Sequence, residues 1–394
     1  MSDRIYLDNA ATTQVKPEVV AAMTPFFMEI YGNPSSVHGF GRETRKVVED
    51  SRGKLARVLN ASPDEIYFTG CGTESDNWAV KGAATRSVKK GKHIITSAVE
   101  HHAVLHTCEA LSKQGFEITY LPVTEQGIVQ PSVLASAIRS DTTVVSVMLA
   151  NNEIGTIQPV TELAAIAHEY GALFHTDAVQ AVGAIPVDVK ALGVDMLSLS
   201  AHKFHGPKGI GALYIKKGAR IDTFMHGGAQ ERERRAGTEN VPYIAGMGAA
   251  IELAAANMEE TARRVQGMRN RMIDGLLERI PDTRLNGDRE RRLPGNVNIS
   301  IRYVEGESLL IALDLAGIAA SSGSACTSGS LDPSHVLLAI GLPHEIAHGS
   351  LRLTLGDGNT EADVDRVLDE LPRIVTRLRG MSPLYADAVA LMRG

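Results

Sequence analysis

The sequence predicts an α/β fold in which a large domain with a mostly parallel sheet is joined to a smaller α+β domain. The chain has 394 residues, more than one typical domain contains. Short β-rich runs alternate with helical patterns through its first half, and a long helical pattern then leads to further strand-like runs. We place the large domain at residues 14–256 and the small domain at residues 1–13 and 257–394.

The runs that predict the large sheet are short, resemble strands and recur between helical patterns, which indicates a mostly parallel sheet whose strands are buried on both faces. They are residues 94–96, 144–149, 173–176, 196–199 and 211–215. In such sheets, ligands bind beyond the carboxyl ends of the strands. Polar residues that directly follow these strands are therefore the first candidates for a site.

A helical pattern runs from about residue 244 to residue 280, because apolar residues there recur at steps of three and four. Examples are Val265, Met268, Met272 and Leu276. This helix leads into the small domain, where residues 297–301 and 351–355 are strand-like and the chain ends in a helix.

The composition is that of an ordinary globular protein, with 44% hydrophobic and 22% charged residues. Forty basic and 46 acidic residues give a net charge of −6, which argues against binding to nucleic acid or to anionic membranes. Three widely spaced cysteines predict a reducing compartment rather than a disulfide framework. The first residues contain charges and no apolar core, so they do not read as a signal peptide, and we expect a cytoplasmic protein.

A candidate site follows two of the predicted strands. Asp177 and Gln180 follow the strand at residues 173–176, and Lys203 follows the strand at residues 196–199. One β-α-β step separates them, so we expect Asp177 and Lys203 to converge at one edge of the sheet. A solvated surface lysine is the alternative, but Ser200, His202 and nearby glycines suit the close approach of a ligand.

This pair fits the chemistry of pyridoxal phosphate. A lysine amine bonds covalently to the cofactor, and a carboxylate keeps its ring nitrogen protonated so that the ring withdraws electrons. A phosphate needs a cradle, and Gly72 and Thr73 follow a strand-like run at the start of a helical pattern. Neither of the glycine-rich motifs typical of nucleoside triphosphate or dinucleotide sites is present.

Two further polar residues follow strands. His101 is a candidate to stack on a planar cofactor, and the alternative is a structural histidine. Asn152 either supplies an amide to the same edge of the sheet or closes a turn.

Two other motifs point to different chemistry but have weak support. Residues 344–348 match the HExxH pattern of zinc peptidases, but Pro343 and Gly349 leave little helix to hold both histidines on one face. Residues 200–203 and 75–77 match elements of β-lactamases in the reverse order, and the third element is missing.

Residues 321–330 read SSGSACTSGS and place Cys326 among five serines and two glycines. Such a segment buries little apolar surface and has much backbone freedom, so the sequence predicts a mobile loop. Mobility suits a thiol that collects a group at a buried site and delivers it elsewhere. A linker with an incidental cysteine is the alternative.

Together these motifs resemble those of the cysteine desulfurases of the nitrogen-fixation and iron–sulfur-assembly type, in the long-cysteine-loop branch of the class V aminotransferase family. The resemblance extends over nearly the whole chain. The matching segments are residues 6–13, 32–36, 71–75, 150–153, 175–180, 234–240, 321–330 and 334–335.

The resemblance implies a fold-type I pyridoxal-phosphate enzyme and a homodimer. It makes Lys203 the residue that bonds the cofactor, Asp177 the partner of the ring nitrogen and Gln180 a donor to the ring's phenolic oxygen. The remaining cofactor contacts that it implies are His101 stacked on the ring, with Gly72, Thr73, Asn152, Ser200 and His202 around the cofactor and Thr238 reaching the phosphate in the partner subunit. Asn152 and Arg352 are the implied substrate contacts, with Arg352 binding the carboxylate.

The implied activity converts L-cysteine to L-alanine, with His101, Lys203 and Cys326 as catalytic residues. Cys326 takes the sulfur as a persulfide and passes it to an acceptor or scaffold protein for iron–sulfur cluster assembly, with nitrogenase as the expected recipient. No metal is required, although Cys326 is a candidate transient ligand of a cluster. The alternatives are a selenocysteine lyase, a housekeeping desulfurase for general cluster assembly and an aminotransferase.

Overall fold

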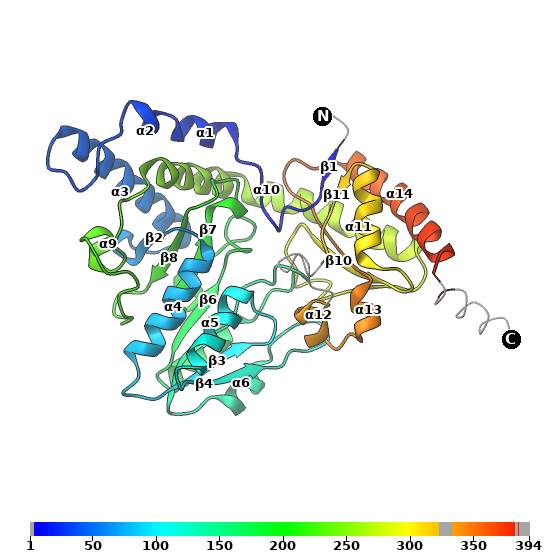
Figure 1. The fold of residues 1–394 in the computed structure, drawn as a ribbon, viewed down its shortest axis with the longest axis horizontal. Helices are drawn as coiled ribbons and strands as arrows, with labels where there is room; N and C mark the ends of the chain where they lie inside the picture. Colours follow the sequence, from blue (N-terminus) through cyan, green and yellow to red (C-terminus); the bar gives the residue numbers. More distant parts are fainter. Residues whose placement is uncertain (1–3, 323–332, 383–384, 386–394) are drawn as a thin grey trace.

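The computed structural model describes residues 4–322, 333–382 and 385. Two sheets lie at opposite ends of the fold, and the longest helix, α10 (Val241–Arg279), extends from one to the other (Figure 1). In the part of the chain that is described, no helix has both the length and the apolar character needed to cross a bilayer.

The large sheet has seven strands in the order β2-β8-β7-β6-β5-β3-β4. Strands β3 to β7 are parallel to one another, whereas β8 is antiparallel to both β7 and β2. This arrangement confirms the predicted mostly parallel sheet. The strands are β2 (Ile66–Thr69), β3 (His93–Ser97), β4 (Glu117–Leu121), β5 (Thr142–Ser146), β6 (Leu173–Asp177), β7 (Met196–Ser200) and β8 (Gly211–Ile215).

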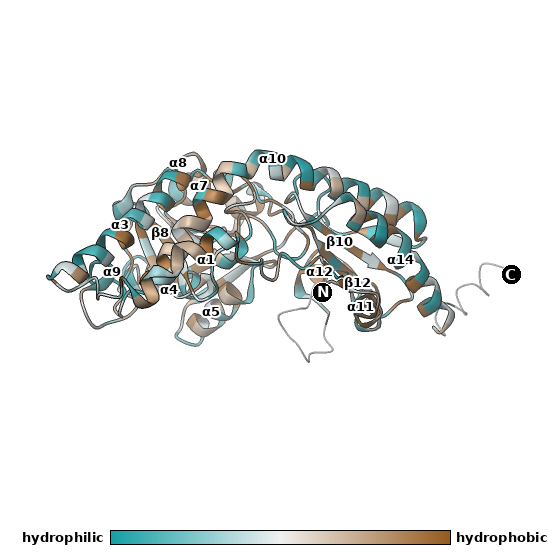
Figure 2. Ribbon diagram, turned by 90° about the horizontal axis from the view of Figure 1, so that it is seen from above, coloured by the Kyte–Doolittle hydropathy of each residue, from teal (hydrophilic) through white to brown (hydrophobic). Residues whose placement is uncertain are grey.

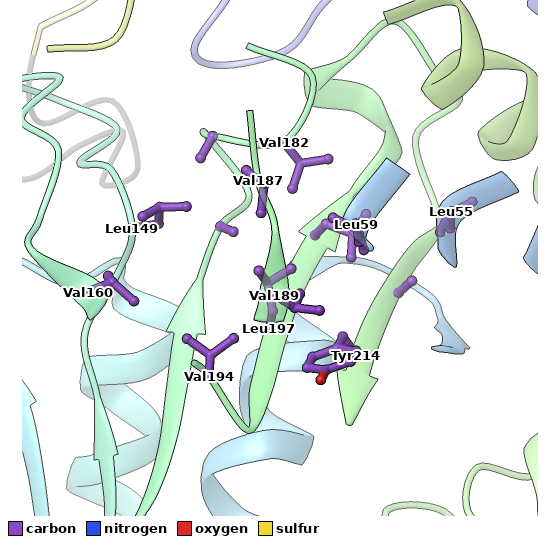
Figure 3. Packing of buried hydrophobic residues seen from close by; sticks show 14 of the residues in the cluster. Leu55, Leu59, Leu149, Val160, Val182, Val187, Val189, Val194, Leu197 and Tyr214 are labelled. Carbon is purple, nitrogen blue, oxygen red and sulfur yellow. The ribbon is translucent and has the colours of Figure 1, made fainter. Parts of the chain in front are cut away.

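Helices cover both faces of this sheet, as a buried parallel sheet requires. On one face, Leu55 and Leu59 from a helix pack with Leu197 and Tyr214 from the strands (Figure 3). On the other face, Trp78 belongs to a second buried cluster. The helices of this part are α1 (Pro17–Met23), α2 (Pro25–Met28), α3 (Gly39–Leu59), η1 (Pro63–Glu65), α4 (Gly72–Arg86), α5 (His102–Ser112), α6 (Pro131–Ala137), α7 (Val160–Glu169), α8 (Val189–Leu192), η2 (Ala201–Lys203) and α9 (Gln230–Glu233).

The small sheet has three antiparallel strands in the order β12-β10-β9 and a core of its own. The N-terminal strand β1 joins this end of the molecule, because it pairs in parallel with β11. The elements of this part are β1 (Ile5–Tyr6), β9 (Thr283–Leu285), β10 (Asn296–Ile301), α11 (Gly306–Leu315), β11 (Ile318–Ala319), α12 (His335–Ala339), α13 (His344–His348), β12 (Ser350–Thr354) and α14 (Glu361–Gly380).

Helix α10 contributes to both cores. Ile244 and Met247 in its first half belong to the core of the large sheet, whereas Met268 and Met272 in its second half belong to the core of the small sheet. Figure 2 shows the helix extending from the side of α7 and α8 toward β10 and α14. The predicted domain boundary at residues 256/257 falls within this helix, and the domain division stays a prediction.

The elements differ from the sequence prediction at several places. Helix α10 begins at Val241, three residues earlier than predicted, because Pro242 suits a first turn and the Asn240 side chain accepts a hydrogen bond from the Tyr243 N–H. The strand predicted at residues 144–149 ends at Ser146. Strand β4 was not predicted, because this edge strand is partly exposed and has no continuous apolar run.

Candidate active site

A cavity of about 300 Å³ lies beyond the carboxyl ends of β6 and β7. Its walls also include the start of α4, residues from the N-terminal segment and one residue of β12 in the small sheet. Among the predicted site residues, those that line it are Gly72, Thr73, His101, Asn152, Asp177, Gln180, Ser200, His202, Lys203 and Arg352. The fold therefore brings together residues that lie up to 280 positions apart, from Gly72 to Arg352.

The start of α4 and the end of β7 form a wall suited to an anion. The first N–H groups of a helix lack partners within the helix and carry its positive dipole end. A Cβ at Gly72 would lie 2.8 Å from Val179 Cγ2, so this position has no room for a side chain. The Ser200 hydroxyl is buried without a hydrogen-bond partner in the described structure. Both features fit the phosphate of the predicted cofactor.

Asp177 lies at the end of β6 and is only 4% exposed. Its Oδ1 accepts a hydrogen bond of 2.9 Å from the Val179 N–H. Burial raises the pKa of this carboxyl to about 6, although the Val179 N–H and the charge of Lys203 favour its ionised form. An ionised Asp177 near neutral pH is what a protonated ring nitrogen requires.

Lys203 ends the short helix η2 that follows β7. Its Nζ donates to the carbonyl of Ala11 at 2.9 Å and to that of Ala10, whose oxygen also accepts from Gln180 Nε2 at 2.9 Å. His202 Nδ1 lies 3.1 Å from Thr12 Oγ1. The N-terminal segment thus fixes three of the predicted cofactor residues, and Lys203 and Asp177 line the same cavity, as the sequence predicts.

His101 is the N-cap residue of α5, and its Nδ1 accepts a hydrogen bond of 3.1 Å from the Ala103 N–H. Burial, and secondarily the charge of Lys203, lower the pKa of this imidazole to about 4. His101 is therefore neutral at physiological pH, and its Nε2 carries the proton because Nδ1 acts as an acceptor.

Arg352 enters the cavity from β12 and joins the small sheet to the site. Its Nη1 donates to the Asn152 carbonyl and its Nη2 to Asp8 Oδ1, each at 3.0 Å. Its Nε is buried without a hydrogen-bond partner in the described structure. The predicted carboxylate-binding role stays a prediction, and Asp8 is a contact that the sequence did not reveal.

Thr238 and Cys326 are the predicted site residues that do not line the cavity in the described structure. Thr238 is exposed in the turn before α10. Cys326 lies outside the described residues. Ser321 and His335 are described residues that precede and follow this segment. The Ser321 N–H donates to the carbonyl of the cavity residue Arg352, and His335 Nε2 donates to the Glu100 carbonyl at 2.9 Å.

The structure also shows cavity residues that the sequence did not single out. Asp76 and Met148 are two of them. Asp76 is the fifth residue of α4 and follows Gly72 by one turn, so both lie on the same side of the helix. This spacing was the sequence signal that could have placed Asp76 at the cavity. The HExxH motif forms the five-residue helix α13, and the described residues contain no group of three side chains arranged to hold a metal ion.

Comparisons with known proteins point in one direction. The family described as Aminotransferase class-V matches residues 5–367. A protein named Cysteine desulfurase IscS, from Methanosarcina thermophila, is 60% identical over 380 residues, which cover 96% of this chain and 94% of the relative. A solved structure described as a NifS-like protein has a TM-score of 0.89 at 41% identity and covers 95% of this chain and 100% of its own. The structure described as SspA in complex with cysteine has a TM-score of 0.79 at 33% identity, with coverages of 90% and 100%.

Proposed function

The chain belongs to the class V aminotransferase family and, within it, to the pyridoxal-phosphate-dependent cysteine desulfurases, and we propose that it converts L-cysteine to L-alanine with Cys326 as the sulfur acceptor. The observation that carries this proposal is the cavity in which Lys203, Asp177 and the unpartnered Ser200 hydroxyl meet Arg352. One wall suits a phosphorylated, cationic ring, and the other offers a guanidinium to a carboxylate.

Each wall has a defined task in this proposal. Gly72, Thr73, Ser200 and His202 hold the phosphate, and Asp177 holds the ring nitrogen. When bound, pyridoxal phosphate supplies an electron sink for the bonds at the substrate's α-carbon. Arg352 binds the substrate carboxylate. Lys203 Nζ moves the proton of the α-carbon, because its amine lines the same cavity as Asp177 and Arg352 and can act as a base there.

The sulfur step balances without an external oxidant. The thiolate of Cys326 attacks the substrate sulfur, the Cβ–Sγ bond of the substrate breaks and an S–S bond forms at Cys326 Sγ. A proton delivered to Cβ and the return of the proton to the α-carbon complete L-alanine. One cysteine and one protein thiol thus give one alanine and one persulfide.

The sequence distance between Ser321 and Cys326 supports the proposed role of this thiol. Ser321 pairs with Arg352 in a β-bridge, and Cys326 follows it by five residues. Five extended residues span at most about 18 Å. This length limits how far the thiol can lie from Ser321, which neighbours the residue proposed to bind the substrate.

Replacing Cys326 by alanine tests this role. We expect the Cys326→Ala variant to bind the cofactor but to release no L-alanine from L-cysteine over many turnovers, because no thiol takes the sulfur. The measurement is alanine formation together with mass spectrometry of the sulfur adduct on the wild-type chain. The matched control, Cys108→Ala, removes a buried thiol outside the cavity and keeps both signals. Full alanine output from Cys326→Ala would instead favour a lyase that needs no protein thiol.

The recipient of the sulfur is also part of the proposal. The expectation that it serves nitrogenase is not supported, because the relative with 60% identity is named IscS. We propose that the persulfide supplies general iron–sulfur cluster assembly through an acceptor protein, which was the alternative. Reconstitution of a cluster on an acceptor with L-cysteine, ferrous iron and the enzyme tests this role, and selenocysteine in place of cysteine tests the lyase alternative.

We also propose a homodimer. Large apolar side chains are exposed around α2 and the turn into α3, and a contiguous apolar surface marks an interaction site. They are Phe27, Met28, Tyr31, Val37 and Phe40, with Met28 75% and Val37 90% exposed. Thr238 is exposed and does not line the cavity of its own chain, which fits a contact with the cofactor phosphate in a second copy.

A further inference from the structure

Asp76 is a buried carboxyl in the wall of the cofactor cavity for which the proposed reaction has no use. It is 1% exposed and lies one turn into α4. It lines the same cavity as Asp177 and Lys203. A buried carboxyl needs a partner or a proton, because an unpaired buried charge is costly.

The hydrogen bonds around Asp76 leave one of its oxygens without a partner. Oδ1 has no hydrogen-bond partner in the described structure. A basic side chain, His175, lies beside this oxygen, with its Nε2 3.7 Å from Asp76 Oδ1. Both ring nitrogens of His175 already contact hydroxyls, Ser146 at 2.8 Å and Ser198 at 2.9 Å. Burial lowers the pKa of His175 to about 3, so this ring is neutral and supplies no positive charge.

The other titratable groups that act on Asp76 are carboxyls from two neighbouring elements. Asp177 at the end of β6 and Glu100 after β3 both oppose a negative charge on Asp76. Burial is the largest of the causes that raise the pKa of Asp76 well above its ordinary value. A hydrogen bond with the Ser198 hydroxyl lowers this pKa but does not cancel the effect of burial.

Asp177 differs from Asp76 in having groups that stabilise its charge. The Val179 N–H donates to it, and the positive charge of Lys203 acts on it. Glu100 accepts hydrogen bonds from the Ser97 hydroxyl and the Met148 N–H, but burial outweighs them and raises its pKa to about 8. Asp76 and Asp177 line one cavity in different surroundings, and such a pair is expected to hold one protonated and one ionised carboxyl.

We propose that Asp76 is a positioning residue that stays a neutral carboxylic acid, so that Asp177 alone presents a negative charge to the ring nitrogen of the cofactor. This inference rests on the proposed function, because that function assigns Asp177 its role. Two ionised carboxylates in one buried wall would repel each other. A neutral Asp76 removes that repulsion, and its side chain still fills its place in the wall.

Infrared difference spectroscopy of the holoenzyme at pH 7 tests the proposal directly. We expect the spectrum of Asp76→Asn, subtracted from that of the wild type, to show the loss of one carbonyl stretch of a protonated carboxylic acid. Other buried acids such as Glu100 are present in both proteins and cancel. The matched control is Asp50→Asn at an exposed site, where carboxylate stretches are lost instead.

Loss of carboxylate stretches in Asp76→Asn would overturn the proposal. Asp76→Ser removes the same carboxyl and gives the same test if the asparagine variant does not fold. Infrared spectra need no turnover, so they separate this inference from the proposed function. An enzyme that makes no alanine but shows the acid band contradicts only the function, and an active enzyme without the band contradicts only the inference.

A pH titration of the bound cofactor's absorption band adds a readout that a purely structural role would not move. We expect the same midpoint in Asp76→Asn as in the wild type, because one neutral group replaces another. An ionised Asp76 would stabilise a nearby positive charge, and its loss would then lower the midpoint by about one unit or more. Such a shift would contradict the proposal.

Discussion

At the scale of single residues, the Ser200 hydroxyl affects both the stability of the apoprotein and the binding of the cofactor. It is buried, it lines the cavity and it has no partner in the described structure. We expect Ser200→Ala to raise the free energy of unfolding of the apoprotein by about 1 kcal/mol or more, because it removes an unsatisfied buried polar group. The same change weakens cofactor binding by about tenfold, since it removes a hydrogen bond to a charged group.

Urea unfolding of the apoprotein and cofactor titration measure the two effects of Ser200→Ala. The matched control is Ser146→Ala, because the Ser146 hydroxyl is also buried but bonds to His175 at 2.8 Å. That change is expected to lower stability and leave the cofactor contacts in place. A Ser200→Ala apoprotein less stable than the wild type would show that the hydroxyl has a partner in solution.

Asp177 makes cofactor binding depend on pH. Its pKa is raised to about 6, first by burial. Below that pH the carboxyl takes up a proton and loses the charge that attracts the ring nitrogen. We therefore expect the affinity of the apoenzyme for the cofactor to fall by about tenfold between pH 7 and pH 5, beyond any change in the cofactor itself.

Asp177→Asn provides the reference for this titration, because it lacks the ionisable group. It is expected to bind weakly at both pH values, and the ratio of its dissociation constant to that of the wild type should shrink as the pH falls. A ratio independent of pH would mean that Asp177 does not titrate in this range.

At the scale of elements, a buried ion pair anchors α9, the helix that precedes Thr238. Arg52 of α3 donates to both carboxylate oxygens of Glu231 at 2.8 and 2.9 Å, and both side chains are almost fully buried. Glu231 has a φ of 44°, a left-handed conformation that needs such external support. The pair thus connects the packing of α3 to the loop that carries Thr238.

We expect Glu231→Gln to destabilise the protein by about 3–5 kcal/mol, because it leaves the Arg52 charge buried without its partner. The measurement is the free energy of unfolding in urea. Glu361→Gln is the matched control, since Glu361 pairs with Arg271 at 2.8 Å on the surface, where such a pair contributes about 1 kcal/mol or less. Equal losses in the two variants would show that burial does not decide the effect.

The elements also show why the sequence revealed some features and not others. Strands β6 and β7 each begin with apolar residues, and the two site residues lie where these strands end, Asp177 as the last residue of β6 and Lys203 three residues after β7. The sequence pattern was therefore enough to find them. Strand β4 is a partly exposed edge and gave no such signal. Asp8 depends on a partner that only the fold brings near, since it contacts Arg352 from 344 positions away.

At the scale of the whole molecule, the cavity lies where two separately packed regions meet. Asp177 and Lys203 belong to the large sheet and its following helix, whereas Arg352 belongs to the small sheet. Helix α10 packs into both cores and therefore connects the region of the proposed cofactor wall to the region of the proposed carboxylate contact.

A mixed dimer tests whether two copies complete each other's sites. We combine Lys203→Ala with Thr238→Asp, whose carboxylate would repel the phosphate, by co-expressing two differently tagged chains. If Thr238 contacts the partner subunit's cofactor, one site of each mixed dimer carries both defects and the other carries none. Purified mixed dimers should then show about half of the wild-type alanine formation, while each variant alone shows little. If Thr238 acts within its own chain, every site in the mixed dimer has one defect, and activity no higher than that of the separate variants would contradict the proposed contact.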